Sequence, residues 1–235
     1  MMNTSELTGI NNSLNAFKDT LSEQEREHYK LLLSLACGGL LGKSDKQGIE
    51  NLALKATLQS LAELQPHHDR VTVNGIAWRG RPDFLSEELF LALNKESRDV
   101  YPLSQRFDDH LVSSGGVVAR QVAFSEQLID LVKKYAGNVI PTGKTNYLYY
   151  NEEGMGIDPH IDNAEFPMNV IMMLDHQSDS SPSALVLYPT DQDPVRIYLK
   201  PGELIILFAD SILHSRERMK ENEEVRIVAF GFQPV

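Results

Sequence analysis

The second half of the chain is a succession of short strand-like segments separated by turn residues. Prolines and glycines interrupt it at Pro159, Pro194 and Pro201-Gly202, and a polar run covers residues 220–224. Such punctuation is typical of short β-strands, and strands at this spacing favour a sandwich, jelly roll or barrel. The segments predicted as strands are 145–150, 160–162, 168–174, 184–188, 195–199, 203–208 and 225–232.

The first half of the chain has a helical pattern instead. Apolar residues recur near a period of 3.6 in 46–64 and 125–136, and helices are also predicted over 5–36 and 86–94. Ser86 and Ser125 are expected to cap their helices, Gly137 to end the last, and Gly38-Gly39 to end the first. Residues 71–78 alternate like a strand, and 95–117 are expected to be irregular.

No linker separates the two halves. The sequence therefore predicts one domain over residues 1–235, of the α+β class. Mainly helical elements and loops (1–116) would pack on a β-rich core (117–235).

Composition excludes several classes of protein. The chain has 235 residues and a net charge of -11, without a basic patch, which argues against nucleic-acid partners. The N-terminus shows no signal-peptide pattern, and the apolar runs are too short to cross a membrane. Cys37 is the only cysteine, so no internal disulfide forms, and it is expected to be buried. These features predict a cytoplasmic protein.

Two side chains in the β-rich half have the spacing of metal ligands. His160 and Asp162 are two residues apart, so on an extended segment they share one face. His214 follows the apolar strand predicted at 203–208 and is the best candidate for a second imidazole. Two imidazoles and a carboxylate form the facial site that holds Fe(II) with open positions. A second cluster, His67-His68-Asp69, lies in a polar turn and is a weaker candidate.

The order His160-Xaa-Asp162, His214, Arg226 resembles the Fe(II)/2-oxoglutarate-dependent dioxygenases. The segment before His160 and the Pro201-Gly202-Glu203 turn before an apolar strand are similar to the prolyl-hydroxylase-like branch of that superfamily. The resemblance covers residues 117–235. It implies a double-stranded β-helix of the jelly-roll or cupin type, with His160, Asp162 and His214 on the iron.

The resemblance also implies a cosubstrate site. 2-Oxoglutarate would chelate the iron through its 1-carboxylate and 2-keto oxygens. Arg226 would bind the far carboxylate of this cosubstrate, because a guanidinium matches a carboxylate bidentately. Val228 stands where many relatives have a Ser, so Tyr150, or Tyr149 in another register, is expected to supply a hydrogen bond. Arg216 and Arg218 are competitors for the Arg226 role, and their charge-rich surroundings predict that they are solvated.

The implied reaction consumes O2 and 2-oxoglutarate and hydroxylates an unactivated C–H bond, with succinate and CO2 as co-products. Asp162 favours hydroxylation, since halogenases of the superfamily have a small residue there. Desaturation or cyclisation at the same iron, and a non-catalytic cupin-like binding domain, are the alternatives.

The expected substrate is a small molecule or an amino-acid unit, either free or bound to a carrier or peptide. Neither its identity nor the oligomeric state follows from the sequence. Residues suggested to contact substrate are Trp78, Arg79, Arg81, Asn163 and Glu165.

Overall fold

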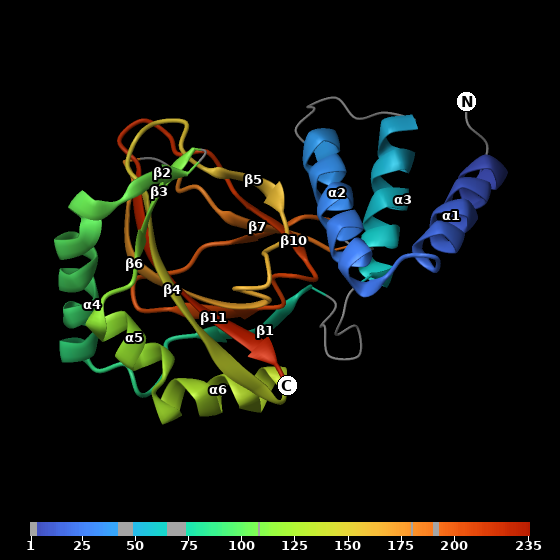
Figure 1. Cartoon of the computed structure of the whole chain (residues 1–235). Coiled ribbons are helices and arrows are strands. Elements are labelled where there is room, and N and C mark those ends of the chain that lie inside the picture. The colour runs from blue at the N-terminus through green and yellow to red at the C-terminus, as the bar shows by residue number, and fades with distance from the viewer. Residues whose placement is uncertain (1–3, 42–48, 65–73, 108, 180, 190–192) are drawn as a thin grey trace.

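Two antiparallel β-sheets face each other and form the centre of the molecule (Figure 1). The structure is a computed structural model that describes residues 4–41, 49–64, 74–107, 109–179, 181–189 and 193–235. The His67-His68-Asp69 cluster lies outside the described residues.

The larger sheet has seven strands in the order β1-β9-β6-β11-β4-β3-β2, and the smaller has four in the order β5-β10-β7-β8. The strands of the larger sheet are β1 (Ile76–Gly80), β2 (Gln105–Phe107), β3 (His110–Ser114), β4 (Val139–Tyr150), β6 (Met168–Gln177), β9 (Leu204–Leu207) and β11 (Glu224–Pro234). Those of the smaller sheet are β5 (Ile157–His160), β7 (Leu185–Tyr188), β8 (Val195–Ile197) and β10 (Leu213–Arg216).

The chain alternates between the two sheets as it runs from β4 to β11. Strands β4, β6, β9 and β11 belong to the larger sheet, whereas β5, β7, β8 and β10 belong to the smaller. This winding is that of a double-stranded β-helix, so the predicted fold class is confirmed.

Both faces of the larger sheet are buried. One face and the smaller sheet enclose an interior apolar cluster that includes Ile171, Leu187 and Ile227. The opposite face packs under helices and includes Val228 and Phe230. Along β11, alternate residues therefore point into the barrel and out toward the helices.

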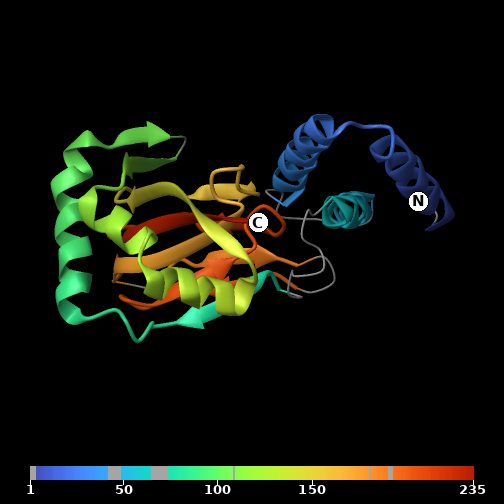
Figure 2. The same cartoon turned by 60° about the horizontal axis from the view of Figure 1, so that its bottom comes forward.

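Three helices cover the outer face of the larger sheet (Figures 1 and 2). They are α4 (Glu87–Val100), α5 (Val117–Ala123) and α6 (Glu126–Ala136). The predicted caps are present: Ser86 accepts a hydrogen bond from Leu89 N, Ser125 accepts one from Leu128 N, and Gly137 ends α6 with a φ of 86°.

The N-terminal helices lie at the other side of the barrel. They are α1 (Thr4–Lys18), α2 (Glu23–Leu41) and α3 (Ile49–Glu63), and α2 and α3 pack beside β5 and β10 (Figure 1). The predicted helix end at Gly38-Gly39 is wrong, because α2 continues to Leu41. Gly38 serves the packing instead: a Cβ there would lie 2.8 Å from the carbonyl oxygen of Pro159.

Other predictions need smaller corrections. The segment 95–117 is not irregular: α4 continues to Val100, and a 3₁₀ helix, η1 (Tyr101–Leu103), β2 and β3 follow. The strand predicted at 71–78 is β1, which begins at Ile76; residues 71–73 lie outside the described part. Cys37 is buried, as predicted. No described helix has the length and hydropathy to cross a bilayer.

Candidate metal centre

Strands β5 and β10 bring the three predicted ligands together at one end of the barrel. The two strands are antiparallel neighbours, and His214 pairs with His160 across them. The Nε2 atoms of His160 and His214 lie 3.4 Å and 3.6 Å from Oδ1 of Asp162. Candidate ligand atoms of all three residues lie within 4.8 Å of one another, which is the geometry of a shared metal site.

Each histidine is oriented by a backbone carbonyl two residues earlier. The Nδ1 atom of His160 lies 2.8 Å from the carbonyl oxygen of Asp158, and Nδ1 of His214 lies 2.9 Å from that of Ile212. A proton on each Nδ1 satisfies these contacts and leaves the Nε2 lone pairs directed at the site. Such outer contacts fix the tautomer and ring orientation of metal-bound histidines.

Asp162 is held by a neutral donor. Nδ2 of Asn169 donates to Oδ2 of Asp162 at 2.7 Å, so Oδ1 is the oxygen directed at the histidines. Burial alone would raise the pKa of Asp162, but the two histidines outweigh it and hold this pKa well below its usual range. Burial alone would lower the pKa of His160, but its contacts with Asp162 and Asp158 together outweigh burial and raise this pKa. The carboxylate is therefore ionised at neutral pH.

Helix α2 supports the segment that carries the first two ligands, His160 at the end of β5 and Asp162 just beyond it. The backbone N–H of Ile161, between His160 and Asp162, donates to Oγ of Ser34 at 3.0 Å. The side chain of Ile161 is buried with that of Leu213, the residue before His214, in a cluster formed with Leu33 and Cys37 of α2. No sequence signal links Ser34 to a segment that lies 127 positions away.

A cavity of about 840 Å³ opens over the three ligands and extends into the barrel. Its walls are mostly apolar and come from both sheets, including Leu148 and Ile171 of the larger sheet and Leu185 of the smaller. A volume of this size is typical of pockets for small organic ligands.

Arg216 lines this cavity, two residues beyond His214 on the same strand. It is 8% exposed, so the prediction that it is solvated is wrong. Its side chain donates to Oγ of Ser183 at 2.9 Å and lies 5.9 Å from the ring centroid of Tyr150. Its Nε has no hydrogen-bond partner among the described residues. Arg216 is thus a buried cation that faces the cavity with unused donor capacity.

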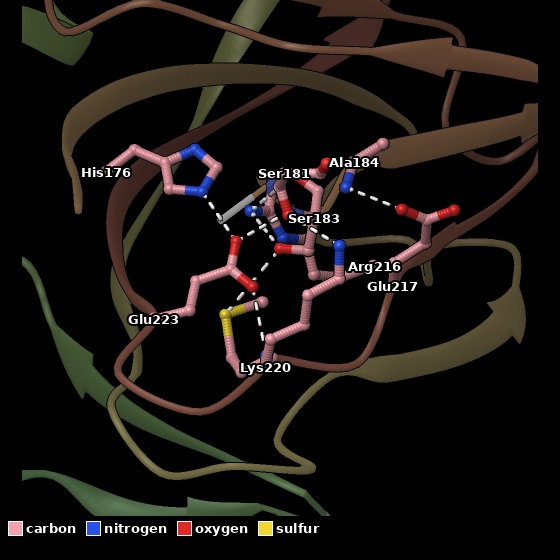
Figure 3. Close-up of polar contacts among 9 residues, drawn as sticks. His176, Ser181, Ser183, Ala184, Arg216, Glu217, Lys220 and Glu223 are labelled. Atoms are coloured by element: carbon pink, nitrogen blue, oxygen red, sulfur yellow. Dashed lines mark hydrogen bonds and ion pairs between the residues drawn. The ribbon is translucent and has the colours of Figure 1, made fainter. Parts of the chain in front are cut away.

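The buried carboxylate of Glu223 fixes the position of Ser183, which in turn contacts Arg216 (Figure 3). Glu223 accepts hydrogen bonds from the backbone N–H groups of Ser183, at 2.6 Å, and Lys220, at 3.0 Å, and contacts Nε2 of His176 at 2.7 Å. Burial alone would raise the pKa of Glu223, but these contacts lower it to about 2. Glu223 therefore holds Ser183, and Ser183 orients Arg216.

Arg226 lies on the opposite face of β11 and does not line the cavity. It donates to Oδ2 of Asp175 at 2.8 Å and to Oγ of Ser97 on α4 at 3.2 Å. The physical reason is the alternation along β11: Ile227 and Ala229 point into the barrel, so Arg226 points toward the helices. Arg226 therefore lies outside the cavity in which it was predicted to bind the cosubstrate.

The two tyrosines are separated in the same way. Tyr150 lines the cavity and stacks on His110, with ring centroids 5.6 Å apart. Burial raises the pKa of Tyr150, so its hydroxyl is protonated at neutral pH. Tyr149 faces α4, where its hydroxyl donates to the carbonyl oxygen of Ser97 at 2.7 Å. His110, which the sequence did not suggest, is also part of the cavity wall.

The suggested substrate residues fall into two groups. Asn163 and Glu165 line the cavity. The others lie on or just beyond β1, away from it: Trp78 stacks on Tyr135, Arg79 pairs with Glu203, and Arg81 pairs with Glu87. Arg218, the remaining competitor of Arg226, is partly exposed and pairs with Asp109 and Asp158.

Comparisons with known proteins are consistent with this architecture. No protein-family model matches the chain, and no curated protein matches it. Among solved structures, the chain is similar to the non-heme alpha-ketoglutarate-dependent epimerase SnoN from nogalamycin biosynthesis, with a TM-score of 0.60 and 16% identity over 76% of this chain and 83% of that one.

Two further solved structures agree. HygX from Streptomyces hygroscopicus, bound to nickel, 2-oxoglutarate and hygromycin B, gives a TM-score of 0.55 and 10% identity over 69% of this chain and 84% of HygX. A Pseudomonas putida prolyl-4-hydroxylase gives a TM-score of 0.54 and 12% identity over 71% of this chain and 96% of that one. The chain thus has the fold of the Fe(II)/2-oxoglutarate oxygenases.

Proposed function

We propose that this protein is an Fe(II)/2-oxoglutarate-dependent oxygenase of the superfamily that the sequence resembles. The observation that carries the proposal is the convergence of two imidazoles and one carboxylate at the mouth of a barrel that also contains a buried, cavity-facing arginine. A structural role alone does not require ligand atoms of three such residues to share one small space beside a cavity.

The donor set fits Fe(II). Two neutral imidazoles and one carboxylate form a facial set that leaves coordination positions for other ligands. His160 and His214 present Nε2, and Asp162 presents Oδ1. The backbone carbonyls and Asn169 hold these atoms in position before any metal binds, which lowers the cost of ordering them.

The cosubstrate role belongs to Arg216 in place of Arg226. Residues two apart on a strand are separated by ~6.6 Å, which suits a five-carbon dicarboxylate held at one end near His214 and at the other by Arg216. A guanidinium is always charged and matches a carboxylate bidentately. Tyr150, whose ring lies beside Arg216, is the second candidate contact to the same carboxylate. Fe(II), 2-oxoglutarate and O2 together supply an oxidant for C–H bonds, with succinate and CO2 as co-products.

The reaction on the substrate is proposed to be hydroxylation of an unactivated C–H bond of a small molecule or amino-acid unit. A prolyl-4-hydroxylase shares the fold, and so does an epimerase, so the same site also suits outcomes without oxygen insertion. Product mass separates them: hydroxylation adds one oxygen, and desaturation or cyclisation removes two hydrogens.

The test is an anaerobic titration of the purified protein with Fe(II) and 2-oxoglutarate. A visible metal-to-ligand charge-transfer band is expected for the wild type, and none for His160→Ala. His28→Ala is the matched control, because His28 is an exposed histidine of α2 far in sequence from the ligands. A wild-type protein without the band, as a cupin-like binding domain would give, or a His160→Ala variant that keeps it, would overturn the proposal.

A further inference from the structure

The opening of the cavity has an unusual apolar border. Three large apolar side chains lie there and are mostly exposed: Leu35 of α2 (69%), Leu103 of η1 (75%) and Phe107 of β2 (65%). Leu35 is far in sequence from Leu103 and Phe107, yet all three line the same cavity. Exposed apolar residues that gather around a pocket mark a binding surface.

The apolar surface continues inward from this border. Val112 and Leu148 line the cavity from β3 and β4, and Ile157 lines it from β5, close to His160. The lining also contains uncharged polar side chains that can form hydrogen bonds with a substrate, such as Gln105, Asn146 and Asn163.

The charged side chains of the lining already have opposite charges beside them or have roles at the metal centre. Arg106 pairs with Glu152 at 3.1 Å, and Glu165 pairs with Lys144 at 2.6 Å.

Asp158 pairs with Arg218 at 2.5 Å. In the proposed function Asp162 is a metal ligand and Arg216 binds the cosubstrate. Each carboxylate and arginine of the described lining therefore has an opposite charge beside it or a role at the metal centre, so none is left to compensate an ammonium or carboxylate on the substrate. Burying an uncompensated charge is costly.

From the apolar border and the compensated charges, we infer that the substrate is a neutral small molecule with a rigid apolar body, such as fused or aromatic rings. It enters between α2 and the η1–β2 segment and presents a C–H bond at the metal. This inference rests on the proposed function, and it places the N-terminal helices in substrate recognition through Leu35.

The experiment uses two fluorescent probes that share an aromatic body and differ in charge. N-phenyl-1-naphthylamine is neutral, and 8-anilino-1-naphthalenesulfonate is anionic. Binding is measured on the full chain loaded anaerobically with Fe(II) and 2-oxoglutarate, so that Arg216 is occupied. The neutral probe is expected to bind saturably and at least about tenfold more tightly than the anionic one, as desolvating the sulfonate is unfavourable.

Variants locate the site. Leu35→Glu and Phe107→Glu are each expected to weaken binding of the neutral probe at least about fivefold, since each removes apolar contact area and adds a charge. Leu32→Glu is the control: Leu32 is 63% exposed on the same helix but does not line the cavity. All three positions are exposed, so thermal stability should change little.

The outcomes separate this inference from the proposed function. A charge-transfer band together with equal binding of both probes, or with no effect of Leu35→Glu and Phe107→Glu, would overturn the inference and leave the oxygenase intact. Loss of probe binding in Leu32→Glu as well would show adsorption to α2 instead of entry into the cavity, and would also overturn it. Absence of the charge-transfer band would refute the proposed function itself.

Discussion

Arg216 and Arg226 are a matched pair on neighbouring stretches of chain, and replacing each with Met tests which one anchors the cosubstrate. Arg216 faces the cavity and is buried, whereas Arg226 faces α4 and pairs with Asp175. Methionine keeps most of the length and apolar volume of arginine and removes the charge. We expect Arg216→Met to lose affinity for 2-oxoglutarate and Arg226→Met to keep it.

The magnitude follows from the burial of Arg216. Truncating one partner of a buried, hydrogen-bonded charge pair costs about 2–5 kcal/mol, so the Kd for 2-oxoglutarate should rise roughly 30-fold to a few thousand-fold. Arg226 forms a partly exposed ion pair, whose loss costs about 0–1 kcal/mol of folding stability. The Kd of Arg226→Met should therefore stay within about twofold of the wild type.

Stability of the ligand-free protein distinguishes an anchor from a purely structural arginine. Burial lowers the pKa of Arg216, and its Nε has no hydrogen-bond partner among the described residues, so the ligand-free protein carries a poorly compensated charge. Replacing this arginine with an apolar side chain removes the desolvation cost of the charge. We expect the Tm of ligand-free Arg216→Met to stay within about 4 °C of the wild type while cosubstrate affinity collapses.

The assay is the charge-transfer band at saturating Fe(II), titrated anaerobically with 2-oxoglutarate. Arg216→Lys keeps the charge but not the two parallel donors, so an intermediate Kd is expected. Binding by Arg216→Met within about threefold of the wild type would refute the assignment. If Arg226→Met lost affinity in the same series, the role would return to Arg226.

Two further variants test the elements that support the site. Ser34→Ala leaves the Ile161 N–H buried without its acceptor, at a cost of about 1–3 kcal/mol, so both Tm and Fe(II) affinity should fall. The control is Ser13→Ala, which removes an exposed hydroxyl of α1 and should change neither quantity. Equal Fe(II) affinity in the two variants would contradict the support role of Ser34. Glu223 has its pKa lowered from 4.5 to about 2 on folding, so the stability it contributes is complete above about pH 4.5 and is lost as the pH falls toward 2. Acid unfolding followed by circular dichroism should show that loss in the wild type but not in Glu223→Gln, and identical pH profiles would disprove the coupling.

Much of the fold was predictable because its signals are local. Ser86 and Ser125 cap the helices they precede, and proline or glycine turns separate most of the strands of the barrel. Strand β10 was missed for a physical reason. Its inward-facing residues are His214 and Arg216, so its sequence lacks the apolar alternation by which strands are recognised. A strand that faces a polar site is the kind that such a pattern overlooks.

The geometry of the metal site was predictable only in part. His160 and Asp162 share a face because of their spacing, and that required no knowledge of distant segments. The support from Ser34 depends on α2 packing against β5 across 127 positions, and nothing local to either segment indicates it. The same holds for the segment at Ser183, whose position depends on Glu223 and thereby on a turn 40 residues further along.

The misplacement of Arg226 has a more general cause. Alternation along β11 correctly placed Arg226 on the face of Val228 and Phe230, but that face is covered by helices and the other face forms the barrel interior. When both faces of a sheet are buried, an apolar pattern does not distinguish inside from outside. A metal ligand on a strand shows which face of that strand is inside, because the ligand must point into the site. Arg216 shares a strand with His214 at an even spacing, so the ligand fixes the direction of the arginine. The separation between metal ligand and cation is then set by the rise of one strand, and a shift of β10 would move both together.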